Sequence, residues 1–202
     1  MTIYAIINEL SNASEVKDSN TPIWTLVSNS SLLQGGNPYF VPDFANTFEL
    51  RPALAVKIGK LGKGIPARFA HRYISGVAPC SMMLATDLLE RLKTAGLPWT
   101  QALSYDRSTT FGHFTEISAE KIASCTIDVQ LESADNMQSL KWTADCMPCR
   151  IEEIIECLSR DNTLKTGDII IAGVAKSGIM LTPGMRATMT IDGVKSPGFN
   201  IR

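Results

Sequence analysis

The sequence predicts a mixed α/β fold in which strands dominate. Short runs of β-branched or alternating apolar residues recur along the chain, whereas few segments have helical spacing. No linker, low-complexity segment or internal repeat divides the chain. With 202 residues it suits a single domain, 1–202, that is large enough to bury a core without disulfides.

The composition excludes several classes of partner. A net charge of −1 leaves no basic face for nucleic acid or anionic lipid, so small molecules or proteins are the expected partners. No apolar run approaches membrane-spanning length, and the N-terminal MTIYAII lacks the pattern of a signal peptide. The five cysteines are an odd number, which fits reduced thiols. We therefore expect a cytoplasmic protein.

In the first half of the chain, the β-branched and apolar runs at 3–7, 23–27 and 54–58 predict strands. Glycine and proline at 35–38 predict a reversal between the last two of these strands. The pattern changes to helix from Ala67, and leucines at helical spacing predict a helix over 82–95. Gly96 and Pro98 would end that helix.

In the second half, loop and short strand are expected over 100–114, and apolar residues alternate with polar ones over 127–131, which indicates a half-exposed strand. The segment 151–158 (IEEIIECL) predicts a helix with acidic residues in its first turn. The run Ile169, Ile170 and Ile171 predicts a buried strand, and alternating strands follow in the tail around Gly193.

The stretch 163–184, TLKTGDIIIAGVAKSGIMLTPG, has the pattern of a site loop. A buried strand between glycine turns runs into small residues as far as Gly178, an arrangement that brings backbone groups close to a ligand. A hydroxyl group that could meet an anion or a metal-bound oxygen is expected in such a loop. The central residue is instead Val174.

Five motifs extend this observation to nearly the whole chain. In order they are PYFVPDF, LAVKIGKLGKGI, KTAGLPW with a following YD, IEEIIECLS and TLKTGDIIIAG. Their order and spacing resemble the fumarylacetoacetate hydrolase (FAH) family in its short single-domain form. The resemblance implies a β-roll fold, usually a homodimer, and a divalent metal, Mg, Mn or Ca, held by carboxylates. Family members hydrolyse, hydrate, decarboxylate or isomerise 2-oxo acids and acylpyruvates, because the metal stabilises the enolate.

The family's metal ligands, carried over by counting from these motifs, fall on Arg51, Ala53 and Met82. A guanidinium repels a cation, and a thioether is too soft to replace a carboxylate. Glu49 lies nearby, but we interpret it as a structural or surface acid. We therefore expect no metal cofactor.

Other family site positions are replaced as well. The family's lysine falls on Leu103, its loop hydroxyl on Val174 and the following proline on Ala175, while Tyr105 and Asp106 are retained. The remaining replacements are Asn8, Glu9 and Leu10 for the early Arg-Asn-Tyr segment, Ala13 for the general-base histidine, Val27 and Ser28 for a Lys-Pro pair, and Lys141, Trp142, Thr143 and Ala144 for a Gln-Gly-Asn-Thr segment.

The favoured interpretation is a catalytically impaired pseudoenzyme that binds a small anionic ligand or a protein partner, including an active paralogue. Arg51 and Lys176 would make its pocket cationic. The candidate pocket residues are Arg51, Met82, Leu103, Tyr105, Asp106, Gly173, Val174 and Lys176. No catalytic residue is assigned; Asp106 keeps its family position, which a role in capping a loop would also explain.

Two alternatives stay open. The first is an active FAH-family enzyme with a rearranged or metal-free site. The second is thiol redox chemistry at Cys146 and Cys149, a CxPC motif directly before a helix, where a thiolate would be stabilised. A zinc site that adds Cys157 lacks a fourth ligand at a usual spacing. His71 and His113 match no family base and are interpreted as loop or helix-surface residues.

Overall fold

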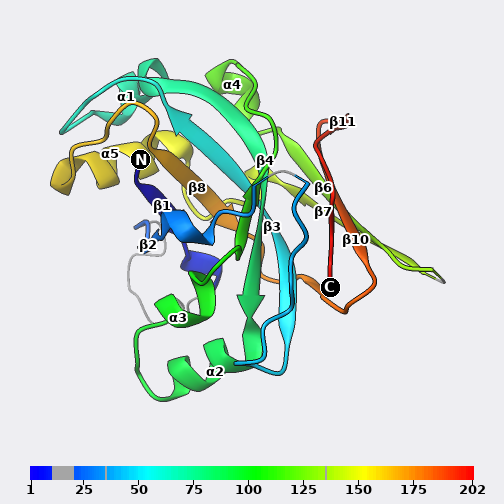
Figure 1. Ribbon diagram of the computed structural model, residues 1–202. Coiled ribbons are helices and arrows are strands. Elements are labelled where there is room, and N and C mark those ends of the chain that lie inside the picture. The colour runs from blue at the N-terminus through cyan, green and yellow to red at the C-terminus, as the bar shows by residue number, and fades with distance from the viewer. Residues whose placement is uncertain (11–20, 35, 135) are drawn as a thin grey trace.

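The computed structural model describes residues 1–10, 21–34, 36–134 and 136–202. Within these ranges the chain forms two sheets (Figure 1). The larger sheet has the strand order β2-β1-β8-β3-β4-β5, with β9 beside β3, and the smaller has the order β11-β10-β6-β7, with β12 beside β10. In Figure 1 the long strands β3 and β4 curve through the centre, with β6, β7 and β10 on one side and α5 on the other. The predicted strand-dominated α/β class is confirmed.

The larger sheet consists of β1 (Ile3–Ile6), β2 (Trp24–Val27), β3 (Phe48–Ile58), β4 (Ile74–Ala85), β5 (Thr109–Phe111), β8 (Ile169–Val174) and β9 (Ile179–Met180). The smaller sheet consists of β6 (Thr126–Glu132), β7 (Met137–Thr143), β10 (Arg186–Ile191), β11 (Val194–Lys195) and β12 (Phe199–Asn200). The helices are α1 (Ala67–Ala70), α2 (Thr86–Thr94), α3 (Thr100–Leu103), α4 (Ala119–Ile122) and α5 (Ile151–Asp161), and the 3₁₀ turns are η1 (Asn8–Leu10), η3 (Asn29–Ser31), η4 (His71–Tyr73) and η5 (Ala144–Cys146).

The antiparallel pair β3 and β4 forms the centre of the larger sheet. Phe48 lies opposite Ala85 at one end of the ladder, and Ile58 lies opposite Ile74 at the other. The sequence predicted only the second half of β3. Pro52, which lacks an N–H and is unusual in a central strand, hides the first half. Its carbonyl accepts a hydrogen bond from the Ala175 N–H at 2.9 Å, so it still joins the sheet to the loop after β8.

The predicted helix over 82–95 is wrong in its first turn. Strand β4 continues to Ala85, and helix α2 begins only at Thr86. Met82, Met83 and Leu84 are all buried, although successive strand residues face opposite sides of the sheet. A run buried on both faces is continuously apolar, and periodicity cannot distinguish it from a buried helix. The predicted end is confirmed, since Gly96 has a φ of 66° and its N–H donates to the Lys93 carbonyl.

Strand β8 is the predicted strand of the glycine-rich stretch, extended to Val174. It pairs parallel to β1 and antiparallel to β3. Asp168 fixes its start, because one carboxylate oxygen accepts from the Thr2 N–H at 2.7 Å and the other from the Lys165 N–H at 2.8 Å. The end of β8 then lies beside β3, with Val174 opposite Ala53. The starting point of the loop after β8 is therefore fixed by the pairing of β8 with β1 and β3.

The smaller sheet and α5 follow the predicted periodicities. Ile127, Val129 and Leu131 of β6 are buried, while the residues between them are partly exposed. Strand β7, which follows β6 in a hairpin, was not predicted because its outer residues are polar. The buried residues of α5 recur at helical spacing, namely Ile151, Ile154, Ile155 and Leu158.

In the described part of the chain, no helix is long and apolar enough to span a membrane.

Candidate functional site

The structure brings together the positions that the family resemblance assigns to metal ligands. Arg51 and Ala53 lie two residues apart on β3 and therefore share a face. Met82 of β4 lies directly opposite Arg51, and Val174 of β8 lies opposite Ala53. Opposed residues of paired strands project to the same side. Four separated positions thus meet on one face of the larger sheet.

The side chains at three of these positions are buried in the core. Ala53 and Met82 are 0% exposed and Val174 is 1% exposed. Leu103, at the position of the family's lysine, is also fully buried. None of them lines either of the two cavities described below. Their side chains belong to the apolar core.

Arg51 is held by two neighbours. Its Nη2 lies 2.9 Å from Glu49 Oε2, and its Nε donates to the same oxygen at 3.0 Å. The arginine stem also passes closely over the loop after β8, because a Cβ on Gly178 would stand 2.7 Å from Arg51 Cγ. The interpretation of Glu49 as a structural acid agrees with this pairing. The Arg51 side chain is only 13% exposed, and its guanidinium is directed to Glu49.

The donor atoms at these positions do not fit a hard divalent cation. Mg, Mn and Ca prefer several oxygen ligands, whereas Arg51, Ala53 and Met82 offer a guanidinium, a methyl and a thioether. The Thr109 hydroxyl is buried without a hydrogen-bond partner opposite Met82, but it is a single neutral oxygen. Among the described residues, no group of three or more His, Cys, Asp or Glu side chains could hold a metal ion.

The two retained family residues have separate surroundings. The Tyr105 hydroxyl donates to the Met83 carbonyl at 2.9 Å and therefore accepts from the Tyr39 hydroxyl, also at 2.9 Å. Burial raises the pKa of both phenols, that of Tyr39 to about 12. Asp106 is exposed in the following turn, next to Arg107 with its φ of 60°. Tyr105 thus has a structural hydrogen bond, and Asp106 lies at the surface.

A small cavity forms where three segments that carry replaced family site positions meet. Its volume is about 220 Å³. The segments are η1, the end of β7 with η5, and the loop after β8. The lining residues are Glu9, Leu140, Lys141, Trp142, Cys146, Ala175, Lys176 and Ser177. Of the eight pocket residues proposed from the sequence, only Lys176 lines this cavity. Ala13 lies outside the described residues.

Trp142 forms one wall of this cavity. A Cβ on Gly173 would stand 3.2 Å from Trp142 Cζ2 and 3.1 Å from Met147 Cγ, so both side chains lie on the glycine. Lys141 also lines the cavity and lies opposite Asp128 of β6, whose carboxylate is available to balance its charge. Lys176 lines the cavity from the loop after β8 and is exposed.

The CxPC cysteines differ in exposure. Cys146 is exposed and lines the small cavity, whereas Cys149 is buried. Burial, and then the negative charge of Glu153, raises the pKa of Cys149 to about 11. This shift is opposite to the one that a reactive thiolate needs. Cys157, the third member of the zinc alternative, is half-buried on α5.

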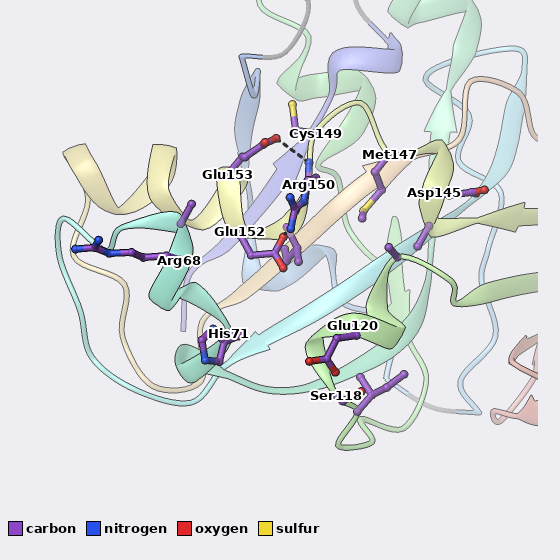
Figure 2. Close-up of a pocket in the computed structure, with 15 residues that line it drawn as sticks. Arg68, His71, Ser118, Glu120, Asp145, Met147, Cys149, Arg150, Glu152 and Glu153 are labelled. Carbon is purple, nitrogen blue, oxygen red and sulfur yellow. Dashed lines mark hydrogen bonds and ion pairs between the residues drawn. The ribbon is translucent and has the colours of Figure 1, made fainter.

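A larger groove was not predicted. Figure 2 shows it between α1, η4, α4 with the residues before it, η5 and the start of α5, with a volume of about 980 Å³. Arg68 and His71 line one side, Glu120 another, and Arg150 lies 3.5 Å from Glu152 at the start of α5. The groove joins segments far apart in sequence, and no local pattern marks such a contact. His113 is exposed and lines neither cavity.

The two curved sheets, the glycine loop after β8 and the converging positions on β3 and β4 define a protein of the β-roll class that the motifs implied. A model of the fumarylacetoacetate (FAA) hydrolase C-terminal region matches residues 4–196. The chain belongs to the fumarylacetoacetate hydrolase family.

Two members of the family with named activities are similar to this chain over most of its length. The chain is 30% identical over 182 residues to the mitochondrial oxaloacetate tautomerase FAHD1 of Mus musculus, covering 90% of this chain and 81% of that protein. It is 28% identical over 202 residues to the mitochondrial oxaloacetate tautomerase FAHD2 of Arabidopsis thaliana, covering 96% and 87%. These names favour an enzyme in the relatives.

Among solved structures, a fumarylpyruvate hydrolase from Pseudomonas aeruginosa in complex with Mn²⁺ and pyruvate has a similar fold. The TM-score is 0.75 at 21% identity, over 100% of this chain and 89% of that one. At this identity the likeness concerns the fold.

Proposed function

We propose that this chain keeps the family's recognition of small 2-oxo acids but does so without a divalent cation, as a binding protein impaired in the metal-dependent reaction. One observation carries the proposal. Three segments in which the resemblance places site residues still enclose a cavity, while the metal-ligand positions hold Arg51, Ala53 and Met82. No cofactor is part of the proposal.

The size of the cavity supports a small ligand. Pockets for drug-sized molecules usually measure about 300–1,000 Å³. The cavity of about 220 Å³ is smaller and suits an acid of the size of oxaloacetate, the compound in the names of the relatives. Trp142 gives such a ligand a flat apolar wall, and its carboxylate would face the loop that carries Lys176.

The charges around the cavity support moderate affinity. Lys176 is exposed, so solvent screens its attraction for an anion. Glu9 lines the same cavity and opposes an anion placed deep inside. The favoured arrangement therefore holds one carboxylate near Lys176 at the mouth and the oxo end against Trp142.

The first prediction is that Lys176→Ala weakens binding of oxaloacetate about fivefold, because an exposed charge contributes roughly 1 kcal/mol. Isothermal titration in buffer with chelator measures the change. Lys63→Ala is the matched control, since Lys63 is also an exposed loop lysine but lines neither cavity. Equal affinity in wild type and Lys176→Ala would remove Lys176 from the site.

The second candidate function is an active enzyme on a 2-oxo acid, which the names of the relatives favour. A stopped-flow assay of enol-to-keto conversion of oxaloacetate, with a parallel decarboxylation assay, distinguishes the candidates. Turnover that a chelator abolishes would support the metal-dependent enzyme of the family. Turnover that resists the chelator would support a metal-free enzyme. No turnover above the rate in protein-free buffer would support the binding protein.

A homodimer or a complex with an active paralogue remains part of the proposal, as does the single domain. A cytoplasmic location also remains a proposal, since both named relatives are mitochondrial. Thiol redox chemistry has the least support, given the raised pKa of Cys149. An alkylation rate that rises with a midpoint well below about pH 8.5 would revive it.

A further inference from the structure

Glu49 and Arg51 lie on the same face of β3 as Ala53, and Met82 of β4 stands directly opposite Arg51. The pair therefore lies at the place that the family resemblance gives to the metal. Arg51 contacts a single Glu49 oxygen through both Nε and Nη2. The only carboxylate within this set is thus already bound to a cation that the chain itself supplies.

The neighbouring backbone keeps the arginine in this place. A Cβ on Gly178 would stand 2.6 Å from the Leu50 carbonyl oxygen and 2.7 Å from Arg51 Cγ. The loop after β8 therefore closes directly onto the arginine stem, and only a glycine permits that distance. Met82 and Ala53, both fully buried, fill the space on the other side with apolar groups.

An ion placed here would meet three obstacles. The guanidinium repels it at short range, Glu49 would have to leave Arg51, and the buried side chains of Ala53 and Met82 offer no oxygen to replace its hydration shell. The Thr109 hydroxyl, buried and without a partner, is a single weak ligand. These obstacles act together, since removing Arg51 alone would free Glu49 but still leave Ala53 and Met82 without a ligand oxygen.

We infer that the Glu49–Arg51 ion pair replaces the divalent cation of this family, so that the site is permanently closed to metal. The pair lies within β3 and keeps this face neutral without an ion, while the arginine stem contacts the loop after β8 at Gly178. This inference concerns the metal position alone. It does not require that oxaloacetate binds in the small cavity.

Methyl NMR tests the inference at the site itself. The protein is labelled with ¹³C-methyl methionine, and the Met82 signal is assigned with Met82→Leu. Bound Mn²⁺ broadens nearby methyl signals. Titration with Mn²⁺ therefore reports whether an ion occupies the family's metal position beside Arg51 and Met82. We expect the Met82 signal to keep its intensity relative to a Mg²⁺ blank at stoichiometric Mn²⁺. Selective loss of that signal at substoichiometric Mn²⁺ would overturn the inference.

A gain-of-function variant provides the positive control. Arg51→Glu combined with Ala53→Glu restores two carboxylates and leaves the Met82 probe in place. In this variant we expect Mn²⁺ to bleach the Met82 signal and to raise the melting temperature, since a ligand at 100 times its Kd raises the folded-to-unfolded ratio about 100-fold. If the variant does not fold, the wild-type titration alone still decides, because Met82 reports directly on the native site.

The outcomes separate this inference from the proposed function. Loss of oxaloacetate binding with an unaffected Met82 signal would remove the proposed ligand and retain the closed metal position. Oxaloacetate binding together with a bleached Met82 signal would retain the proposed ligand and remove the closed metal position.

Discussion

The charge of Arg51 is balanced within its own strand. Glu49 lies two residues away on the same face and accepts from the guanidinium at 2.9 and 3.0 Å. Both side chains are largely covered, at 13% and 26% exposure, so water screens their attraction less than at an open surface. The pair is thus expected to stabilise the fold measurably.

A double-mutant cycle measures this stabilisation. Glu49→Gln, Arg51→Met and the double variant are unfolded with urea, and we expect a coupling free energy of about 1 kcal/mol. The reason is that each single change leaves one charge partly buried without its partner. Arg160 and Asp161, an exposed pair, supply a control cycle in which the coupling should be near zero. Equal coupling free energies in both cycles would show that the Glu49–Arg51 pair stabilises the fold no more than an exposed ion pair does.

Tyr39 gives the fold a dependence on alkaline pH. Its pKa rises from 10.0 to about 12 on folding, chiefly through burial. A raised folded pKa contributes stability that is complete below pH 10 and is lost as pH rises toward 12. When the pH is raised from 9 to 11.5, the free energy of unfolding measured with urea should therefore fall by roughly 2 kcal/mol less in Tyr39→Phe than in wild type. Parallel losses in both proteins would contradict the assignment, and Tyr73→Phe is the control.

The residues that define the metal position could be found from sequence by counting along motifs, and the structure places them together. The partner of Arg51 could not be found in this way. Strand alternation told only that Glu49 shares a face with it, whereas the contact depends on rotamers and on the closeness of Gly178. The small cavity was also missed, because it needs three segments to meet in space.

At the scale of elements, the sequence predicts a helix or strand well when only one of its faces is buried. It misleads when both faces are buried. The helix α5 and the strand β6 follow clean periodicities and were predicted close to their observed ends. Strand β4 is buried on both faces, and its methionines and leucine continued the helical pattern of α2 backwards. Pro52 concealed the first half of β3 in a similar way.

The loop after β8 is expected to tolerate no side chain at Gly178. Gly178→Ala would place a methyl 2.6 Å from the Leu50 carbonyl oxygen, and the backbone of β3 cannot move away cheaply. We expect a loss of about 1–3 kcal/mol in the free energy of unfolding, as for other overpacked sites. The neighbouring change Ser177→Ala should stay within about 0.5 kcal/mol, because Ser177 is exposed. Similar stability of the two variants would show that the loop is not packed as described.

At the scale of the whole molecule, five motifs in register predicted the family and the strand-dominated fold. Motifs of this kind record backbone requirements, such as the turn at Gly167 before β8, which has a φ of 89°. They are largely independent of the side chains that do the chemistry, so a chain can keep the fold while the site changes. The groove of Figure 2 lies beyond such motifs, because helices α1 and α5 come together only through the tertiary fold.

Family membership and a changed metal position together lead to the central claim, that this chain recognises a 2-oxo acid without a divalent cation. Calorimetric titration of oxaloacetate in chelator and again in Mg²⁺, each corrected by a blank without protein, tests it most directly. The account predicts saturable heat with the same Kd in both buffers. Heat that appears only with Mg²⁺ would contradict it.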